Sequence, residues 1–311
     1  MASILVTGAA GYIGSVLVPR LLEEGHSVIA LDSFLYQQTS LIECCASPRF
    51  QLVRGDVRDV ELISTLLRGV DAIIPLACLT GAPICKLDPV GATTINRDAI
   101  REIIRLRAPS QPIVFPTTNS GYGIGEKDRA CTEESPLRPV SLYGRLKVEI
   151  ERELLDAGNV VTLRLATVFG ASPRMRTDLL VNDFVLRAVR DRFVVLFEAD
   201  FRRNFLHVRD AADAFVHVLE NFERMRDRPY NVGLSEANIT KRQLCEEIKG
   251  QVPDFFFCEA PMGEDPDKRD YIVSNDRMEA TGFRARRSLR EGIAELVKAY
   301  RVFRAFPTGN V

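Results

Sequence analysis

The first half of the chain alternates short apolar runs with segments whose apolar positions follow a helical period. The apolar runs predict strands near residues 4–6, 27–31, 50–53, 70–76 and 112–115. The amphipathic segments predict helices at about residues 16–24, 60–68 and 97–107. Near-continuous apolar runs are typical of parallel strands that are covered on both faces. This alternation predicts an α/β protein with a doubly wound parallel sheet and right-handed crossovers.

The second half of the chain has a less regular pattern. After a long helix from residue 143, the pattern predicts strands and helices at 160–165, 180–190, 193–197, 210–222, 229–232 and 289–303. We expect residues 1–170 to form a cofactor-binding domain. Residues 171–311 are expected to form mainly a smaller, interleaved substrate-binding domain, with segments near 200–235 rejoining the first domain.

A glycine-rich turn, TGAAGYIG at residues 7–14, ends the first apolar run. Gly8 allows a sharp exit from the strand, Gly11 lets the backbone approach a pyrophosphate, and Gly14 lets the next helix pack close to the sheet. The N-terminus of that helix faces an anion. Because the turn follows a predicted strand and opens a predicted helix, it indicates a Rossmann domain that binds a dinucleotide.

Two acidic residues follow the next strands. Asp32 ends the second strand, eighteen residues after Gly14. A carboxylate there accepts hydrogen bonds from the ribose hydroxyls and repels a 2'-phosphate, which predicts NAD rather than NADP. Asp56 follows the third strand and is a candidate for contact with the adenine amino group, although an aspartate in this position is also typical of a turn.

Candidate catalytic residues lie after the fifth strand. Thr118 is expected at the carboxyl edge of the sheet, and Tyr143 and Lys147 share one face of a helix. Oxidation of an alcohol requires a base for its proton while a nicotinamide accepts the hydride. We predict Tyr143 as the base, with its pKa lowered by Lys147 and by the cationic nicotinamide. We also expect Lys147 to form hydrogen bonds with the nicotinamide ribose hydroxyls, and Thr118 to orient the substrate hydroxyl by a hydrogen bond.

Composition narrows the classes of partner. The formal net charge of -1 argues against nucleic acid or an anionic membrane as the main partner. We expect a cytoplasmic protein, because neither a membrane-spanning run nor a signal-peptide pattern is present. The seven cysteines and three histidines have no metal-ligand spacing, so we expect neither a metal site nor a disulfide framework.

The motifs at 7–14 and 143–147, together with Asp32, Asp56 and Thr118, resemble the extended short-chain dehydrogenase/reductase family over nearly the whole chain. The resemblance implies NAD as cofactor, a nucleotide-activated sugar as substrate, and Thr118, Tyr143 and Lys147 as catalytic residues. The cofactor site that it implies comprises Gly8, Gly11, Tyr12, Ile13, Gly14, Asp32, Asp56, Val57, Leu76, Tyr143 and Lys147. The substrate site that it implies comprises Thr118, Asn119, Asn182, Arg203 and Arg269.

The resemblance also implies a homodimer. In the family, helices corresponding to residues 97–107 and 143–156 pair into a four-helix bundle. An apolar stripe on these helices suits either that interface or the core beneath the sheet: Ile100, Ile103, Ile104, Ile150 and Leu154.

Departures within the family favour one reaction. Dehydratases and decarboxylases carry an acid directly after the catalytic Ser or Thr, where this chain has Asn119, and C3/C5 epimerases carry a cysteine where it has Ser120. Once those reactions are excluded, the remaining reaction of the family is hydride transfer at the sugar C4 alone. Stretches at 116–123, 164–170, 172–175 and 265–274 look most similar to GDP-manno-heptose 4-dehydrogenases.

We therefore predict NAD-dependent oxidation of the C4 hydroxyl of a nucleotide-activated sugar, resembling GDP-heptose 4-dehydrogenation. A nucleotide-sugar 4-epimerase, such as a UDP-hexose 4-epimerase, is the alternative, although such epimerases usually carry Asn near Thr167 and His at Pro75. A non-catalytic NAD-binding sensor is the second alternative. Retention of Thr118, Tyr143 and Lys147 together favours an enzyme.

Overall fold

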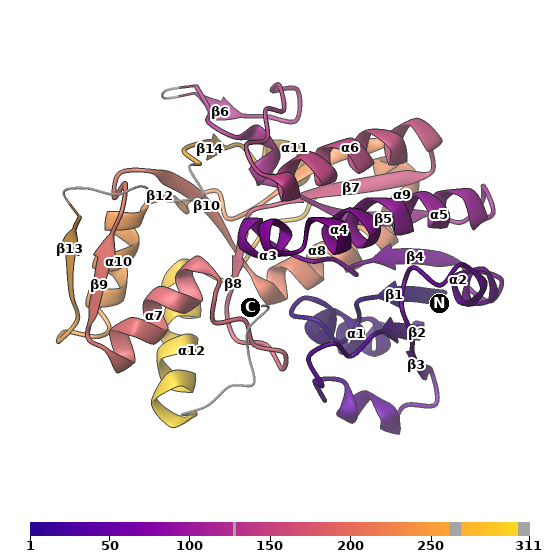
Figure 1. Ribbon diagram of the computed structural model, residues 1–311, viewed down its shortest axis with the longest axis horizontal. Coiled ribbons are helices and arrows are strands. Elements are labelled where there is room, and N and C mark those ends of the chain that lie inside the picture. The colour runs from indigo at the N-terminus through magenta and orange to yellow at the C-terminus, as the bar shows by residue number, and fades with distance from the viewer. Residues whose placement is uncertain (127–128, 261–268, 304–311) are drawn as a thin grey trace.

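A seven-stranded parallel sheet organises the computed structural model, which describes residues 1–126, 129–260 and 269–303 (Figure 1). The strand order is β11-β7-β5-β4-β1-β2-β3. The strands are β1 Ser3–Thr7, β2 Ser27–Asp32, β3 Phe50–Arg54, β4 Ala72–Pro75, β5 Ile113–Thr118, β7 Val160–Leu165 and β11 Arg228–Val232. The order reverses between β1 and β4, which confirms the predicted doubly wound α/β fold.

Helices cover both faces of this sheet. On β1, Ile4 and Val6 belong to one apolar core and Leu5 to the other, because successive side chains of a strand point to opposite faces. The first core is covered by α1 Gly14–Glu23 and α8 Val208–Glu220, with α9 Phe222–Met225 beside them. The second is covered by α2 Val60–Leu67, α5 Ala99–Leu106 and α6 Leu142–Ala157.

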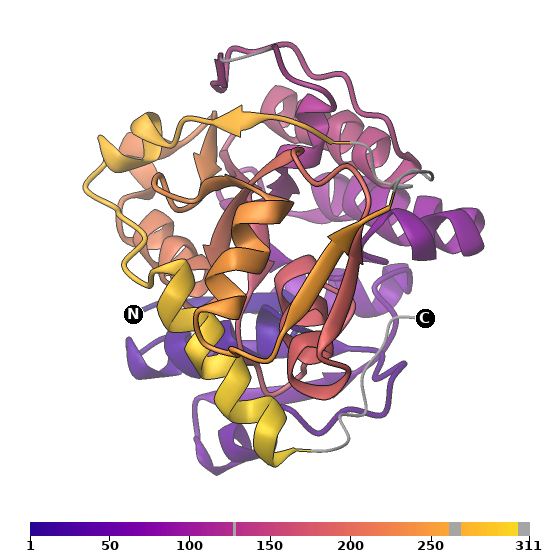
Figure 2. The same ribbon diagram turned by 90° about the vertical axis from the view of Figure 1, so that its left-hand side faces the viewer.

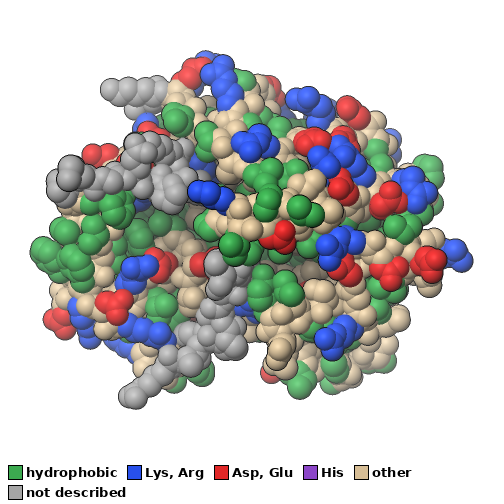
Figure 3. Space-filling model, viewed as in Figure 1, with side chains coloured by type: hydrophobic (Ala, Val, Ile, Leu, Met, Phe, Trp, Pro, Cys, Tyr) green, Lys and Arg blue, Asp and Glu red, His purple; other side chains and the backbone are tan. Residues whose placement is uncertain are grey.

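The apolar stripe on α5 and α6 belongs to this second core. Ile100, Ile103, Ile150 and Leu154 are at most 1% exposed within a single chain, so the interpretation of the stripe as a dimer interface is corrected. The outward faces of the two helices are charged, and Arg101 pairs with Glu149 and Glu153 at 2.7 and 2.6 Å. Basic and acidic side chains are interspersed on this side of the molecule (Figure 3). Homodimerisation itself stays a prediction.

A smaller unit packs beside the carboxyl ends of the sheet (Figures 1 and 2). It contains a three-stranded sheet of β12 Asn238–Thr240, β10 Arg202–His207 and β8 Thr167–Phe169, and a parallel pair of β9 Phe193–Leu196 and β13 Phe256–Glu259. Around its apolar core lie α7 Leu180–Arg190, α10 Lys241–Lys249 and α12 Leu289–Val302. Of the segments near 200–235, α8 and β11 return to the large sheet, whereas β10 stays in the smaller one.

The structure contains several short elements that the sequence pattern did not predict. The helix predicted at 97–107 is preceded by α3 Ala82–Leu87, α4 Pro89–Thr93 and a π-helical turn at Thr94–Asp98. Asp88 caps α4 by accepting a hydrogen bond from Gly91, and Pro89 occupies the first helical position. The remaining short elements are η1 Ile42–Ala46, η3 Asn119–Tyr122, α11 Asp276–Glu279 and the strand pair β6 Ala130–Cys131 with β14 Ile272–Val273.

In the described part of the chain, no helix is long and apolar enough to cross a bilayer.

Candidate active site

A cavity of about 550 Å³ lies between the carboxyl ends of the large sheet and the smaller unit. Its lining includes most of the predicted site residues: Gly8, Gly11, Tyr12, Ile13, Gly14, Asp32, Asp56, Val57, Leu76, Thr118, Tyr143, Lys147, Arg203 and Arg269. Residues that are far apart in the sequence therefore meet at one site. Asn119 and Asn182 do not belong to the lining.

The glycine turn forms one end of the cavity. Gly8 has a positive φ of 64°, and a Cβ atom there would lie 2.5 Å from the backbone nitrogen of Ala77. A Cβ atom on Gly14 would lie 2.3 Å from the carbonyl oxygen of Ala9. Both positions therefore exclude any side chain. The turn and the N-terminus of α1 form a backbone cradle that fits the pyrophosphate of a dinucleotide.

Asp32 lies at the end of β2, in the wall of the cavity. Its Oδ2 accepts a hydrogen bond from the Ala10 amide at 2.9 Å, and its Oδ1 accepts from the Phe34 amide at 2.8 Å and from Gln38 at 3.2 Å. Burial, at 7% exposure, raises the pKa of this carboxyl. These bonds hold the carboxylate at the position where the adenosine ribose of NAD binds in this fold.

Asp56 lies at the same end of the cavity, but its carboxylate already forms an ion pair within the protein. Arg58 forms an ion pair with it at 2.6 Å, and the hydrogen bonds from Arg58 lower the pKa of Asp56. An adenine amino group at this place would have to share the carboxylate with Arg58. Asp56 is also the N-terminal anchor of its own turn, because its Oδ1 accepts from the Arg58 amide.

Tyr12 joins the two units beside the glycine turn. Its hydroxyl donates to the carbonyl oxygen of Gly170 at 2.6 Å and accepts from Asn182 Nδ2 at 3.2 Å. Asn182 also donates to the carbonyl oxygen of Arg176 and accepts from the Gly170 amide. In this structure the Asn182 amide holds residues 170–176 in place, and its contact with substrate stays a prediction.

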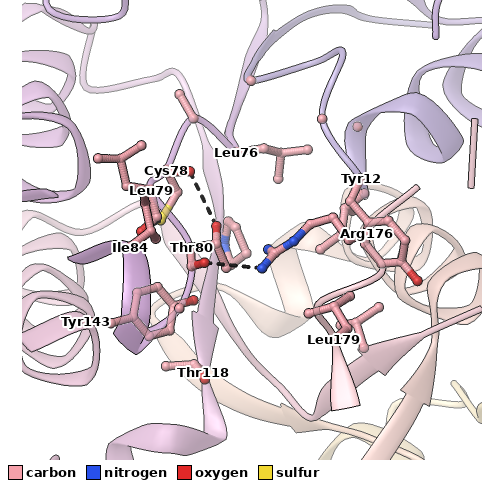
Figure 4. Close-up of a pocket in the computed structure, with 18 of the residues that line it drawn as sticks. Tyr12, Leu76, Cys78, Leu79, Thr80, Ile84, Thr118, Tyr143, Arg176 and Leu179 are labelled. Carbon is pink, nitrogen blue, oxygen red and sulfur yellow. Dashed lines mark hydrogen bonds between the residues drawn. The ribbon is translucent and has the colours of Figure 1, made fainter. Parts of the chain in front are cut away.

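Thr118, Tyr143 and Lys147 come together at the other end of the cavity. Tyr143 lies in the first turn of α6, which Ser141 caps by accepting from the Gly144 amide at 3.1 Å. Figure 4 shows the Tyr143 and Thr118 side chains next to each other at the end of β5. Lys147 Nζ donates to the carbonyl oxygen of Pro116 at 2.9 Å, below the same site.

The electrostatics of Tyr143 differ from the expectation. Burial raises the pKa of Tyr143, and the neighbouring thiols Cys78 and Cys85 raise it further, whereas Arg176 and Arg269 lower it. Lys147 is not among the main causes of this shift, and its ammonium group donates to the Pro116 carbonyl; the lowering expected from Lys147 together with a bound nicotinamide stays a prediction. The protein alone therefore keeps the phenol protonated at neutral pH.

Two arginines of the smaller unit enter the cavity, and sequence reasoning did not assign them to the site. Arg176 pairs with Asp178 through its Nε at 3.0 Å, and it donates to the carbonyl oxygen of Thr80 at 3.3 Å across the cavity (Figure 4). Arg174 lies 4.7 Å from the centre of the Tyr36 ring at the adenosine end. The sequence feature that could have indicated them is the basic stretch at 172–176. Whether its side chains point into the cavity depends on how the two units pack.

The predicted substrate residues fall into two groups. Arg203 and Arg269 line the cavity, and Arg269 contacts Ser120 beside Thr118. Asn119 is 1% exposed, and neither atom of its amide forms a hydrogen bond with the described residues. Asn119 does not line the cavity in this structure, and its contact with substrate stays a prediction. Residues 265–268 of the stretch at 265–274 lie outside the described residues.

Comparison with known proteins identifies the family. Residues 4–233 match the model of the NAD dependent epimerase/dehydratase family. The chain belongs to this family. The match includes the glycine turn, Asp32 and the Thr118, Tyr143 and Lys147 cluster, so the protein is an enzyme of an NAD-dependent family and its predicted cofactor is confirmed.

Individual relatives cover most of the chain. UDP-glucuronic acid decarboxylase 1 of Arabidopsis thaliana is 28% identical over 312 residues, covering 96% of this chain and 69% of that protein. UDP-glucose 4-epimerase of Azospirillum brasilense is 27% identical over 292 residues, covering 85% and 82%. The structure of UDP-glucose 4-epimerase from Thermus thermophilus in complex with NAD matches with a TM-score of 0.82 at 25% identity, covering 96% and 99%.

Proposed function

We propose that the protein oxidises the C4 hydroxyl of a nucleotide-activated sugar, with NAD as the hydride acceptor. The observation that carries the proposal is the meeting of Thr118, Tyr143 and Lys147 in the cavity that the glycine turn and Asp32 also line. An alcohol hydroxyl beside Tyr143 would lie next to both a base and an orienting hydroxyl. A non-catalytic sensor has no need of this cluster.

The protein residues have separate roles in this reaction. Thr118 orients the sugar hydroxyl, Tyr143 accepts its proton, and Lys147 holds the ribose on the nicotinamide side. When bound, NAD supplies a hydride acceptor and a positive charge. That charge favours the phenolate form of Tyr143 and so opposes the effect of burial on its pKa. Arg203 and Arg269 suit the diphosphate, since guanidinium groups bind such anions through paired hydrogen bonds.

The choice of reaction at C4 rests on the residues beside Thr118. Asn119 stands where dehydratases and decarboxylases of the family carry an acid, and Ser120 stands where C3/C5 epimerases carry a cysteine. Neither side chain supplies the additional proton-transfer group of those reactions at neutral pH. We propose GDP-manno-heptose as the first substrate to test. A UDP-hexose 4-epimerase is the second candidate, which the similarity to UDP-glucose 4-epimerases favours.

A substrate panel tests this proposal. Purified protein is incubated with NAD and with GDP-manno-heptose, UDP-glucose, UDP-galactose or UDP-glucuronate, while nicotinamide absorbance and product stereochemistry are followed. We expect a 4-keto product with reduced cofactor for a dehydrogenase, and an inverted C4 centre without net reduction for an epimerase. Loss of CO₂ from UDP-glucuronate, or no reaction with any sugar, would contradict the proposal.

Asp32 is predicted to decide the cofactor preference. The variant Asp32→Asn keeps one acceptor oxygen but removes the negative charge that repels a 2'-phosphate. We expect the ratio of NADP to NAD affinity to rise at least tenfold, by a gain for NADP and a loss for NAD. Titration calorimetry with both cofactors measures this ratio, and Asp191→Asn, an exposed site on the smaller unit, is the control. An unchanged ratio in Asp32→Asn would overturn the assignment.

A further inference from the structure

Ser120 connects the candidate catalytic hydroxyl to the smaller unit. Its Oγ accepts a hydrogen bond from Thr118 Oγ1 at 2.9 Å and also accepts one from Nη1 of Arg269. Its backbone amide donates to Thr118 Oγ1 at 3.1 Å. Ser120 is 5% exposed and lines the cavity together with Thr118 and Arg269. Neither the family match nor the sequence motifs assign a role to it.

The hydrogen bonds determine the direction of the Thr118 hydroxyl. A hydroxyl group has one proton and two lone pairs. The proton of Thr118 is directed to Ser120 Oγ, and one of its lone pairs accepts from the Ser120 amide. Because Ser120 Oγ accepts from both Thr118 and Arg269 in this structure, its own proton is directed away from both of them. A sugar hydroxyl that gives its proton to Tyr143 needs a donor for its oxygen, so the Thr118 proton turns to the sugar, and the Ser120 proton turns to Thr118 Oγ1 in its place.

We propose that Ser120 and Arg269 are positioning residues: Arg269, from the unit that carries the nucleotide sugar, holds Ser120, and Ser120 fixes the Thr118 hydroxyl for the reaction. This inference rests on the proposed oxidation at C4. Arg269 follows Ser120 by 149 positions and belongs to the second half of the chain. A guanidinium group has five N–H donors, so one arginine serves both a phosphate and a hydroxyl. Binding of the diphosphate and orientation of the catalytic hydroxyl are thereby coupled.

The charged groups around Tyr143 give the inference a second consequence. Arg176 and Arg269 face Tyr143 from the smaller unit and favour its ionised form, whereas Cys78 and Cys85 oppose it. Lys147 is directed to the Pro116 carbonyl. Removing the positive charge of Arg269 raises the pKa of Tyr143, so the rise of activity with pH moves to higher pH. A contact with a purely structural role would not move this profile.

The Ser120 variants test the positioning role. In Ser120→Ala, the backbone amide that donates to Thr118 remains and only Oγ is lost. We expect kcat for the active sugar to fall roughly three- to tenfold, the range for loss of one neutral hydrogen bond. Affinity for UDP and GDP, measured by calorimetry, should be unchanged. Ser120→Thr should recover most of kcat, and Thr65→Ala, an exposed hydroxyl on α2, is the matched control.

The Arg269 variants test the coupling. Arg269→Lys keeps the charge and should lower kcat more than it weakens UDP or GDP binding, whereas Arg269→Gln should also move the pH profile of kcat upward. In the double variant Ser120→Ala/Arg269→Lys, the losses in kcat should be less than additive, because both changes break one chain of contacts. Additive losses, or a wild-type kcat in Ser120→Ala, would overturn the inference.

Failure of the proposed function is separable from failure of this inference. The same double-variant cycle, measured by urea unfolding without any substrate, reports the Ser120–Arg269 interaction directly. A measurable interaction in a protein that oxidises no sugar of the panel would refute the C4 oxidation and leave the contact standing. A protein that is active on a sugar but has no interaction in this cycle would refute the inference alone.

Discussion

Replacing Tyr143 by phenylalanine is expected to lower turnover by about 10²- to 10⁴-fold, the usual contribution of a general base. The ring that packs in the first turn of α6 is retained, and only the proton acceptor is lost. Affinity for the nucleotide sugar should therefore change little. Turnover at saturating substrate and calorimetric binding of the sugar nucleotide measure the two effects separately.

Comparison with Thr118→Ala makes this result specific. In the proposed reaction Thr118 orients the hydroxyl without taking its proton, so its removal should lower turnover less than removal of the Tyr143 hydroxyl. Because the phenolate is the active form, wild-type turnover should increase as pH rises through the pKa that Tyr143 has with NAD bound, where the nicotinamide charge opposes the raising effect of burial. Near-normal turnover in Tyr143→Phe would exclude it as the base and remove the reason for the roles of Thr118 and Lys147.

Replacing Glu151 by alanine is expected to lower the free energy of unfolding by about 3–5 kcal/mol, the cost of breaking a buried ion pair by removing one partner. Glu151 on α6 pairs with Arg164 on β7, with an Nε to Oε1 distance of 2.9 Å and side-chain exposures of 4% and 6%. The other hydrogen bonds of Arg164 go to the Tyr122 hydroxyl and the Glu133 carbonyl oxygen. These neutral acceptors do not compensate its charge.

Glu149→Ala on the same helix is the matched control. Glu149 pairs with Arg101 at 2.7 Å, but their side chains are 43% and 38% exposed. Water screens such a pair, and its contribution is about 0–1 kcal/mol. Urea unfolding of both variants compares the two sites. An equal, small loss at both would show that the buried pair contributes no more than a surface pair.

Local features of the sequence were sufficient to predict the parallel sheet of the first half of the chain and the parts of the cavity that lie on it. The glycine turn was predictable because Gly8 and Gly14 occupy positions where no Cβ atom fits, a requirement of the backbone itself. Asp32 and Thr118 were predictable because each lies at the carboxyl end of an apolar strand, and parallel strands bring their carboxyl ends to one edge. The spacing of Tyr143 and Lys147 followed from the helical period.

The tertiary structure alone decided features that depend on contacts between distant segments. The apolar stripe of α5 and α6 has the same period whether it faces the sheet or a partner, and only its packing assigned it to the core. The direction of the Lys147 ammonium group and the burial of Tyr143 depend on neighbours outside α6, so the sequence alone did not reveal that the protein without NAD raises the pKa of Tyr143. The places of Asn182, Arg176 and Arg269 depend on how the two units pack, which local periodicity does not encode. The sequence therefore determined which groups are candidates for the chemistry, and the packing of the two units determined which of them meet, because side-chain contacts across 149 positions arise only in the folded chain.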